Sequence, residues 1–235
     1  MRQIVLDTET TGLEPSQGHR IIEIGCVELV NRKLTGRHYH QYINPMREID
    51  QGAMEVHGIS NDFLADKPVF EQVVAEFIEF VQGAELIIHN APFDIGFLDS
   101  ELTLSGGQFG KMSGHCSVID TLVMARAMHP GQRNSLDALC RRYFVDNSAR
   151  DLHGALLDSE ILADVYLLMT GGQKTLSLGG ETADGGSDAQ IIRRLGTARS
   201  LSPIISANAV ELERHAGKLI TVDKKSDGSC VWLKN

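Results

Sequence analysis

The sequence predicts an α/β domain, built on a mixed β-sheet flanked by helices and followed by a small C-terminal tail. Three observations lead to this prediction. Apolar, β-branched runs typical of strands lie close together near the N-terminus, and helical and strand-like runs alternate from residue 69 onward. A glycine-rich stretch then separates residues 1–170 from residues 191–235. An antiparallel start followed by strand–helix alternation favours a mixed sheet over a purely parallel one.

The first half of the domain is expected to hold three strands and one helix. Residues 4–7 and 21–30 are apolar and β-branched enough for strands, and the turn at 10–18 joins them as a hairpin. A third strand is expected at 37–43. Apolar side chains at positions 70, 73, 74, 77, 78 and 81 form one helical stripe, which predicts a helix over residues 69–81.

The second half is expected to continue the alternation of strands and helices. Pro92 opens a helix, because proline is tolerated in a first helical turn, and Asn134-Ser135 caps a later one. Two glycines, Gly171-Gly172, end the last helix of the domain. The expected elements are a strand at 85–89, a helix from 92 to about 104, a strand or helix at 118–121, a short helix that ends near 143, and a long amphipathic helix over 154–169.

Charge divides the chain at the same places. The 235 residues carry a formal charge of −9. Residues 1–170 hold 24 acidic and 13 basic side chains, whereas residues 191–235 hold four acidic and eight basic ones. Residues 171–190 contain six glycines and few large apolar side chains, so they cannot bury enough surface to offset the entropy of ordering. We expect a folded domain at 1–170, a flexible linker at 171–190 and a tail at 191–235.

The tail is close to the size below which a domain rarely folds alone. We expect a helix over 209–218 and a hairpin formed by residues 219–222 and 230–233. Such a small unit leaves apolar residues partly exposed and carries positive charge, so we expect it to become ordered on a partner. The alternative is a subdomain packed on the rest of the chain. The apolar residues expected to be exposed are Ile204, Ile205, Val231 and Trp232.

Composition excludes membrane, secreted and fibrous classes of protein. Hydrophobic residues make up 42 % of the chain, and the longest unbroken apolar run is the five residues from Val165 to Met169, far too short to span a membrane. The N-terminus enters a strand-like run without the apolar segment of a signal peptide. The four cysteines lie far apart with no Cys-x-x-Cys pair, which indicates free thiols in a reducing cytoplasm.

Asp7-Thr8-Glu9 ends the first predicted strand and places two acids on one face of it, because residues two apart on a strand share a face. Two carboxylates roughly 6 Å apart repel by about 2–3 kcal/mol at an effective dielectric constant near 20. Next to an apolar run, this repulsion is costly unless a cation lies between them. The alternative is a polar strand end in which Asp7 only caps the following turn.

His89-Asn90-Ala91-Pro92-Phe93-Asp94 is the second motif. It follows a predicted strand, and the helix that Pro92 opens carries Asp94 on its first turn. Phe97 and Leu98, one turn further on, then face the core. The alternative is an ordinary helix start, where an acid stabilises the helix by a few tenths to about 1 kcal/mol.

His153-Gly154-Ala155-Leu156-Leu157-Asp158 is the third motif. Asp158 shares a helix face with Ile161, Leu162 and Val165, so it points inward. Inward acids are rare unless they are paired or bind metal. His153 precedes the helix, and a loop there can carry it over the same site. The alternative is that His153 has a structural role at the helix start.

Together, in this order and with these separations, the three motifs resemble those of the DEDDh exonuclease family. The resemblance implies an RNase H-like fold in which Asp7, Glu9, Asp94 and Asp158 converge to bind two divalent ions. Four oxygen donors without cysteine suit Mg²⁺ or Mn²⁺ rather than zinc. The resemblance further implies two-metal phosphodiester hydrolysis in the 3′→5′ direction, releasing nucleoside monophosphates, with His153 as the general base.

Further segments extend this resemblance to the substrate. Val56-His57-Gly58-Ile59 matches a family segment near the terminal nucleotide, so His57 is a candidate substrate contact; the alternative is a surface-loop histidine. The backbone of Thr8 is a second candidate, beside the acids themselves. The implied substrate-binding set is Asp7, Thr8, Glu9, His57 and Asp158.

The remainder of the chain is similar to the proofreading exonuclease subunits of bacterial replicative DNA polymerases. The matching segments are 169–173, 211–219 and 228–232. They imply that the tail binds the polymerase subunit, and a small accessory subunit is a further candidate partner. Residues 173–178 resemble a sliding-clamp-binding motif in which Gln173, Leu176 and Leu178 contact the clamp, although Leu178 stands where the family often has Phe.

Two other functions remain open at this point. A free-standing DEDDh exoribonuclease would share the three motifs, but such enzymes generally end near the third motif, whereas this chain continues into a linker and a tail. A non-catalytic scaffold of the polymerase would not need five active-site side chains. The sequence therefore favours a metal-dependent proofreading exonuclease of DNA replication.

Overall fold

The computed structural model describes residues 1–148, 150, 152–171 and 206–233. The chain divides into two compact units, Met1–Leu178 and Gly179–Asn235, each of which is treated by itself. Among the described residues, no helix is both long and apolar enough to cross a membrane. The four cysteines are free thiols.

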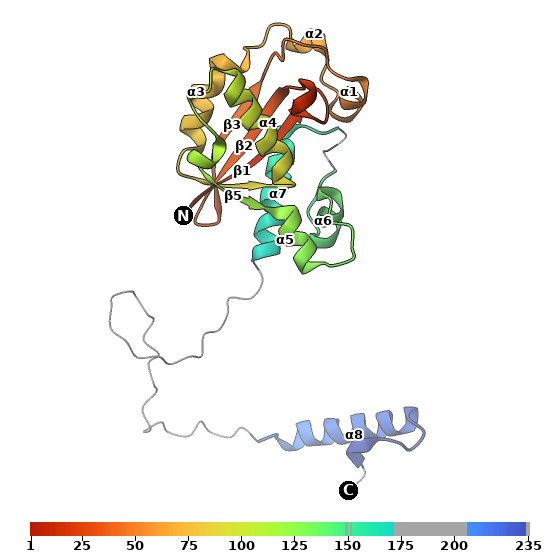
Figure 1. Ribbon diagram of the computed structural model, residues 1–235. Helices are drawn as coiled ribbons and strands as arrows, with labels where there is room; N and C mark the ends of the chain where they lie inside the picture. The colour runs from red at the N-terminus through yellow and green to blue at the C-terminus, as the bar shows by residue number, and fades with distance from the viewer. Residues whose placement is uncertain (149, 151, 172–205, 234–235) are drawn as a thin grey trace, which may run out of the picture. The chain divides into compact units, whose positions relative to one another are not determined.

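The first unit is built on a five-stranded mixed sheet with the order β3-β2-β1-β4-β5 (Figure 1). Strands β1, β2 and β3 are antiparallel neighbours, and β4 and β5 add in parallel on the other side of β1. This confirms the predicted hairpin and the predicted mixed sheet. The strands are β1 Arg2–Thr10, β2 Ile21–Val30, β3 Lys33–Tyr42, β4 Glu85–Ile88 and β5 Ser117–Asp120.

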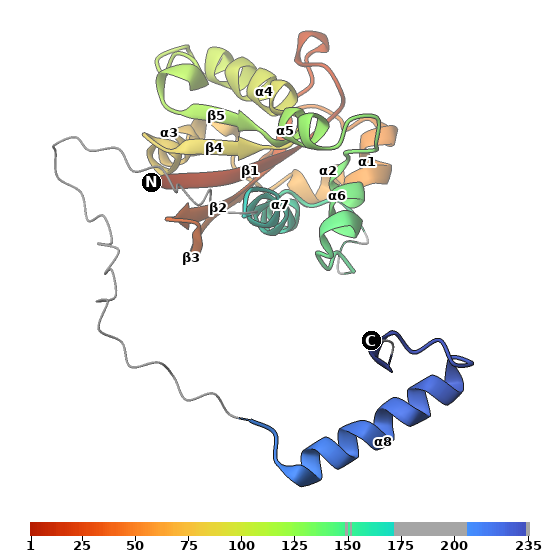
Figure 2. The same cartoon turned by 90° about the horizontal axis from the view of Figure 1, so that it is seen from below.

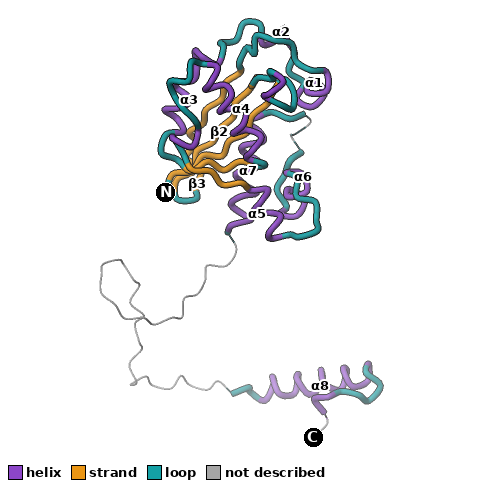
Figure 3. The backbone as a smooth tube through the Cα atoms, in the orientation of Figure 1, coloured by secondary structure: helices purple, strands orange, loops and turns teal. Residues whose placement is uncertain are grey.

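The described part of the first unit contains seven α-helices, α1 to α7, which pack around the sheet (Figure 3). The helices expected near 69–81, 92–104, 135–143 and 154–169 are all present. Residues 117–120 form a strand that leads directly into α5, which resolves the alternative left open for 118–121. No prediction covered α1 and α2. The helices are α1 Gln51–His57, α2 Asn61–Leu64, α3 Phe70–Val81, α4 Ala91–Leu104, α5 Thr121–Met128, α6 Leu136–Tyr143 and α7 Ala155–Thr170.

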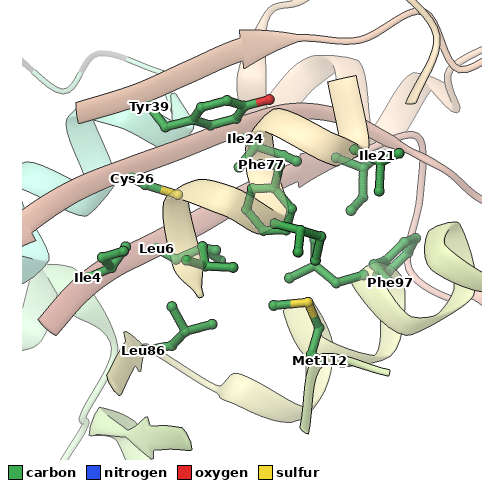
Figure 4. Packing of buried hydrophobic residues seen from close by; sticks show 14 of the residues in the cluster. Ile4, Leu6, Ile21, Ile24, Cys26, Tyr39, Phe77, Leu86, Phe97 and Met112 are labelled. Atoms are coloured by element: carbon green, nitrogen blue, oxygen red, sulfur yellow. The ribbon is translucent and has the colours of Figure 1, made fainter. Parts of the chain in front are cut away.

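The larger core lies between one face of the sheet and helices α3 and α4 (Figure 4). Alternate residues of β1 and β4 supply the sheet side, because successive strand residues point to opposite faces. Phe77 of α3 and Phe97 of α4 are among the largest fully buried side chains. This core fixes the position of β1 relative to β4, and the ends of these two strands carry the first two motifs.

Helix α7 covers the opposite face of the sheet (Figure 2). Val5 of β1 and Ile87 of β4 pack against Leu162 and Tyr166 of α7. Helices α5 and α6 then pack on the outer side of α7 through a separate cluster that includes Leu139. The third motif therefore lies on the helix that crosses the back of the strand carrying the first.

The described part of the second unit is helical. Helix α8, Ala209–Lys225, begins with a reciprocal capping box between Asn208 and Glu211, and a short 3₁₀ turn at Val231–Leu233 follows it. The predicted hairpin of residues 219–222 and 230–233 is wrong: the helix continues through 219–222 to two lysines that favour a helix C-terminus. The exposure predicted for Val231 and Trp232 is confirmed.

Most of the predicted linker, and the start of the predicted tail, lie outside the described residues. The boundaries at 171 and 191 therefore remain predictions. Ile204 and Ile205 also lie outside the described part of the chain.

Candidate active site

The end of the central strand β1 carries the first motif. Asp7 and Glu9 share the α7 face of the sheet with Val5, by strand alternation. Thr8 points to the opposite face, where its hydroxyl donates to Oδ1 of Asp94 at 2.7 Å. The strand end thus gathers acids from both faces of the sheet.

Asp94 reaches the site from the first turn of α4, as predicted. The residue before this helix, Asn90, has a left-handed backbone with φ of 70°, and its N–H donates to Oδ1 of Asp120 at 3.3 Å. Because β4 is the parallel neighbour of β1, the turn into α4 lies beside the end of β1. Asp94 is only 3 % exposed, and Phe97 and Leu98 are buried in the core.

Asp158 reaches the site because α7 approaches the sheet closely at Gly25. Gly25 is the register partner of Asp7 in β2, and a Cβ at this position would overlap the backbone of Ala155 at the start of α7. The Ser159 hydroxyl donates to the Gly25 carbonyl at 2.8 Å. The first turn of α7 is therefore held against the sheet beside Asp7, and Asp158 is buried as predicted.

His153 lies on the segment before α7, beside Asp158. Its backbone N–H donates to the Val56 carbonyl at 3.1 Å, which ties this segment to α1. Its Nδ1 lies 3.4 Å from Oδ2 of Asp158, and its side chain is 46 % exposed. Burial and the nearby Arg150 lower the pKa of His153, so the imidazole is neutral at neutral pH.

One cavity of about 650 Å³ is lined by all five residues that the three motifs supply: Asp7, Glu9, Asp94, His153 and Asp158. A ligand atom from each of Glu9, His153 and Asp158 lies within 4.8 Å of the others. The donors are carboxylate oxygens and one imidazole, without sulfur, which fits a hard divalent cation such as Mg²⁺ or Mn²⁺.

The acids of the site are too crowded to ionise freely. Burial raises the pKa of Asp7 well above its usual range, and the carboxyls of Asp94 and Glu9 raise it further. Burial, followed by the charge of Glu23, raises the pKa of Glu9 to about 8. Burial raises the pKa of Asp94 to about 7, although the Thr8 hydroxyl bond opposes this shift. Additional positive charge would relieve all three.

Two residues that line the cavity, Arg150 and Asp137, were missed from the sequence. The guanidinium of Arg150 donates to both carboxylate oxygens of Asp158 at 2.5 and 2.7 Å. It also donates to Oδ1 of Asp137 at 2.6 Å and lies 2.9 Å from Nδ1 of His153. The only available signal was a basic residue three positions before His153, in a strongly acidic domain.

A second cavity of about 430 Å³ adjoins the first and shares Thr8 and Glu9 with it. His57 lines this cavity and is 5 % exposed at the end of α1, so the alternative of a surface-loop histidine is wrong. Its Nδ1 accepts the Ile59 N–H at 2.9 Å, which leaves the proton on Nε2. Within the described part of the chain, this buried Nε2 has no hydrogen-bond partner.

Neutrality of His57 supports this assignment of the proton. Burial lowers the pKa of His57, against the opposing effects of Glu23 and the Thr10 backbone. A neutral ring with an accepting Nδ1 presents a single N–H donor.

The clamp-binding candidates Gln173, Leu176 and Leu178 lie outside the described residues.

Comparisons with known proteins agree with this geometry. The family model described as "Exonuclease" matches residues 4–166. The chain is 53 % identical to DNA polymerase III subunit epsilon of Salmonella typhimurium, over 98 % of this chain and 97 % of that protein. The corresponding protein of Escherichia coli is 52 % identical over the same shares.

Solved structures show the same fold. A structure titled "Exonuclease X in complex with 5' overhanging duplex DNA" matches 72 % of this chain and 91 % of that one, with a TM-score of 0.57 and 28 % identity. A zinc-bound E. coli ExoI–ssDNA complex matches with a TM-score of 0.63 at 18 % identity, over 73 % of this chain and 41 % of that one. This chain belongs to the exonuclease family with an RNase H-like fold and, within it, to the DNA polymerase III epsilon subunits.

Proposed function

We propose that this chain is the 3′→5′ proofreading exonuclease of bacterial DNA polymerase III, removing mispaired 3′ nucleotides by phosphodiester hydrolysis. The observation that carries the proposal is the single cavity lined by four carboxylates and His153, in a chain similar to epsilon subunits over nearly its whole length. Those residues are the ones a metal-dependent nuclease requires.

Asp7, Glu9, Asp94 and Asp158 would hold two divalent ions, Mg²⁺ or Mn²⁺. When bound, such ions supply Lewis-acid activation of a water molecule and stabilise the charge that develops on the leaving 3′-oxygen. The raised pKa values of Asp7, Glu9 and Asp94 describe a site short of positive charge, which favours cation binding. Two divalent ions would also offset part of the negative charge that a nucleic-acid strand must approach.

His153 would serve as the general base. Its lowered pKa keeps the imidazole neutral at neutral pH, so that a ring nitrogen can accept a proton from the attacking water. Its half-exposed side chain borders the cavity, where a water molecule has access to it. The carboxylate of Asp158, 3.4 Å from Nδ1, would stabilise the imidazolium that results.

The second cavity would receive the 3′-terminal nucleotide. Its lining includes the apolar side chains of Leu13 and Val56, suited to a base or sugar face, next to the acids. Among the described residues, the Nε2–H of His57 has no hydrogen-bond partner, and it would donate to an oxygen of the nucleotide in this cavity. The backbone of Thr8 borders both cavities and would contact the nucleotide where the two meet.

This role for His57 predicts a specific pattern of kinetics. His57→Leu, which removes the donor, should raise KM about 5–30-fold, the equivalent of one lost hydrogen bond of about 1–2 kcal/mol. His57→Gln, whose amide nitrogen takes the place of Nε2, should restore most of that loss. An unchanged KM in His57→Leu would rule out the contact.

The metal and the substrate are tested by one digestion assay. A 5′-labelled DNA primer with a mispaired 3′ nucleotide and an RNA oligomer are incubated with Mg²⁺ and then with EDTA. We expect metal-dependent shortening of the mispaired DNA, faster than that of the RNA. Preference for the RNA would support the exoribonuclease alternative, and no cleavage of either would support the scaffold.

A matched pair of variants on α7 separates the site from its surroundings. Asp158→Asn should abolish cleavage, whereas Asp164→Asn, which changes an exposed acid on the same helix, should leave it unaltered. Cleavage retained in Asp158→Asn would contradict the proposed ligand set.

Association with the polymerase is expected through residues 191–235, which would bind the alpha subunit in the cytoplasm. The described part of this segment exposes Leu212, Ile220 and Trp232, apolar side chains that a partner would cover. Residues 173–178 would bind the sliding clamp, and a small theta-like subunit is a further candidate partner. Clamp binding would be lost in a Leu176→Ala, Leu178→Ala double variant if this assignment is correct, and retained if it is wrong.

A further inference from the structure

Arg150 makes the closest ionic contacts within the active-site cavity. Its Nε and Nη2 donate to the two oxygens of Asp158 at 2.5 and 2.7 Å, so both oxygens of that carboxylate are engaged. Both partners are well buried, with side chains 7 % and 4 % exposed. Such a bidentate pair between a guanidinium and a carboxylate is among the strongest ionic contacts in proteins.

The same guanidinium has a second carboxylate within reach. Its Nη1 donates at 2.6 Å to Oδ1 of Asp137, in the first turn of α6, whose side chain is 48 % exposed. Asn147 also donates to this oxygen, at 3.2 Å, and so fixes the Asp137 carboxylate. Arg150 is therefore held between a buried carboxylate in the site and a more exposed one at its margin.

Arg150 and a divalent cation would compete for the oxygens of Asp158. A bidentate guanidinium covers the carboxylate edge to which a cation would bind, and two positive charges within a few ångströms repel. The proposed function makes Asp158 a metal ligand, and this inference rests on that assignment. Binding of either cation to Asp158 then weakens the binding of the other.

We propose that Arg150 is a positioning residue that takes the place of a divalent cation at Asp158 and, when a metal binds Asp158, gives up this contact and keeps its pairing with Asp137. The guanidinium supplies positive charge to the acid cluster while no metal is bound. Asp137 retains Arg150 afterwards, so the displaced cation does not lose all of its partners. The affinity of the site for a metal then depends on how much more strongly Arg150 pairs with Asp158 than with Asp137.

This exchange also reaches His153. The Arg150 Nη2 lies 2.9 Å from Nδ1 of His153, and because a guanidinium only donates, this nitrogen must accept. When Arg150 moves away, Nδ1 of His153 loses this hydrogen bond. Metal binding and the freeing of the His153 imidazole would therefore occur together. In the metal-free state, a nitrogen of the base remains occupied.

Calorimetric titration of the full chain with Mn²⁺ tests this inference without measuring hydrolysis. Arg150→Gln should bind Mn²⁺ about ten-fold more tightly than the unaltered chain, because no guanidinium has to be displaced. The same variant should melt at a lower temperature in EDTA, because its acids lose their internal cation. Arg141→Gln, which changes an exposed arginine on α6, is the matched control and should alter neither quantity.

A second variant keeps the test decisive if Arg150→Gln does not fold. Asp137→Asn removes the carboxylate that retains Arg150 after its contact with Asp158 is lost, so it should weaken Mn²⁺ binding about three- to ten-fold. In the double variant Arg150→Gln, Asp137→Asn this loss should disappear, because no guanidinium is left to retain. A thermodynamic cycle of the four proteins therefore isolates the coupling between the two residues.

The possible failures are distinguishable. Mn²⁺ binding that is unchanged or weaker in Arg150→Gln, with normal binding by the unaltered chain, overturns this inference alone. An equal effect of Asp137→Asn with and without Arg150 overturns it as well. If the unaltered chain binds no Mn²⁺, the metal site of the proposed function fails, and this inference fails with it.

Discussion

Replacement of Glu9 by glutamine should make the stability of the metal-free protein less sensitive to pH, by the part that Glu9 contributes. Burial and neighbouring acids raise the pKa of Glu9 to about 8 in the folded protein, against a usual value of 4.5. Below about pH 4.5, the carboxyl is protonated in both the folded and the unfolded chain and has no effect. Between pH 4.5 and 8, the unfolded chain releases the proton and the folded chain keeps it, so folding stability falls as pH rises.

Two estimates give a similar size for this effect. A pKa difference of about 3.5 corresponds to about 5 kcal/mol at 1.36 kcal/mol for each unit of pKa. Ligand atoms of Glu9 and Asp158 lie within 4.8 Å of each other, and two charges at that distance repel by about 3.5 kcal/mol at an effective dielectric constant near 20. We therefore expect about 3–5 kcal/mol, or roughly 10 °C in Tm for a domain of this size.

The assay is thermal unfolding in EDTA at several pH values between 5 and 9. Glu9→Gln should melt close to the unaltered protein at pH 5 and roughly 10 °C above it at pH 9. Glu14→Gln, which changes an exposed glutamate in the turn after β1, is the control and should follow the unaltered protein throughout. A difference in Tm that stays constant with pH, or that shrinks as pH rises, would refute the reasoning.

Three further predictions concern the acids, the packing of α7 and the tail. Asp7→Ala should abolish hydrolysis in the digestion assay and leave the metal-free protein at least as stable in thermal unfolding, because it removes one crowded carboxyl; retained hydrolysis would contradict its role as a ligand. Gly25→Ala should lower the free energy of unfolding by about 1–3 kcal/mol and reduce hydrolysis, since the new Cβ pushes Ala155 and α7 away; an unchanged Tm would show that the contact is not tight. Deletion of 191–235 should preserve hydrolysis of single-stranded DNA and abolish capture of the polymerase; unfolding of the shortened protein would place the tail within the folded domain.

Residues fixed by local periodicity were predictable from the sequence. Strand alternation places Asp7 and Glu9 on one face, and helical spacing turns Asp158 inward with Leu162, as found. Both rules depend only on the backbone geometry of a single element. The convergence of the three motifs came instead from the family resemblance, because nothing local brings α7 against β2.

Features that depend on contacts between elements were not predictable. The partners of Arg150 are determined by proximity in the fold. Asp158 lies eight residues later in the chain, and Asp137 lies thirteen residues earlier. The orientation of His57 depends on a hydrogen bond to Ile59 that only the observed helix end creates. The hairpin predicted in the tail is wrong because the β-branched residues at 220–222 suit a strand locally, while the cap at Asn208 starts a helix long enough to include them.

The close approach of α7 to β2 at Gly25 has a consequence for synthesis of the protein. The acids of the first motif leave the ribosome early, whereas Asp158 belongs to the last helix of the first unit. A nascent chain therefore lacks the full set of acids until that helix has emerged and docked against Gly25. If the proposed ligand set is correct, a nascent chain whose α7 has not yet docked cannot cut nucleic acid, and the order of the motifs delays nuclease activity until the first unit is complete.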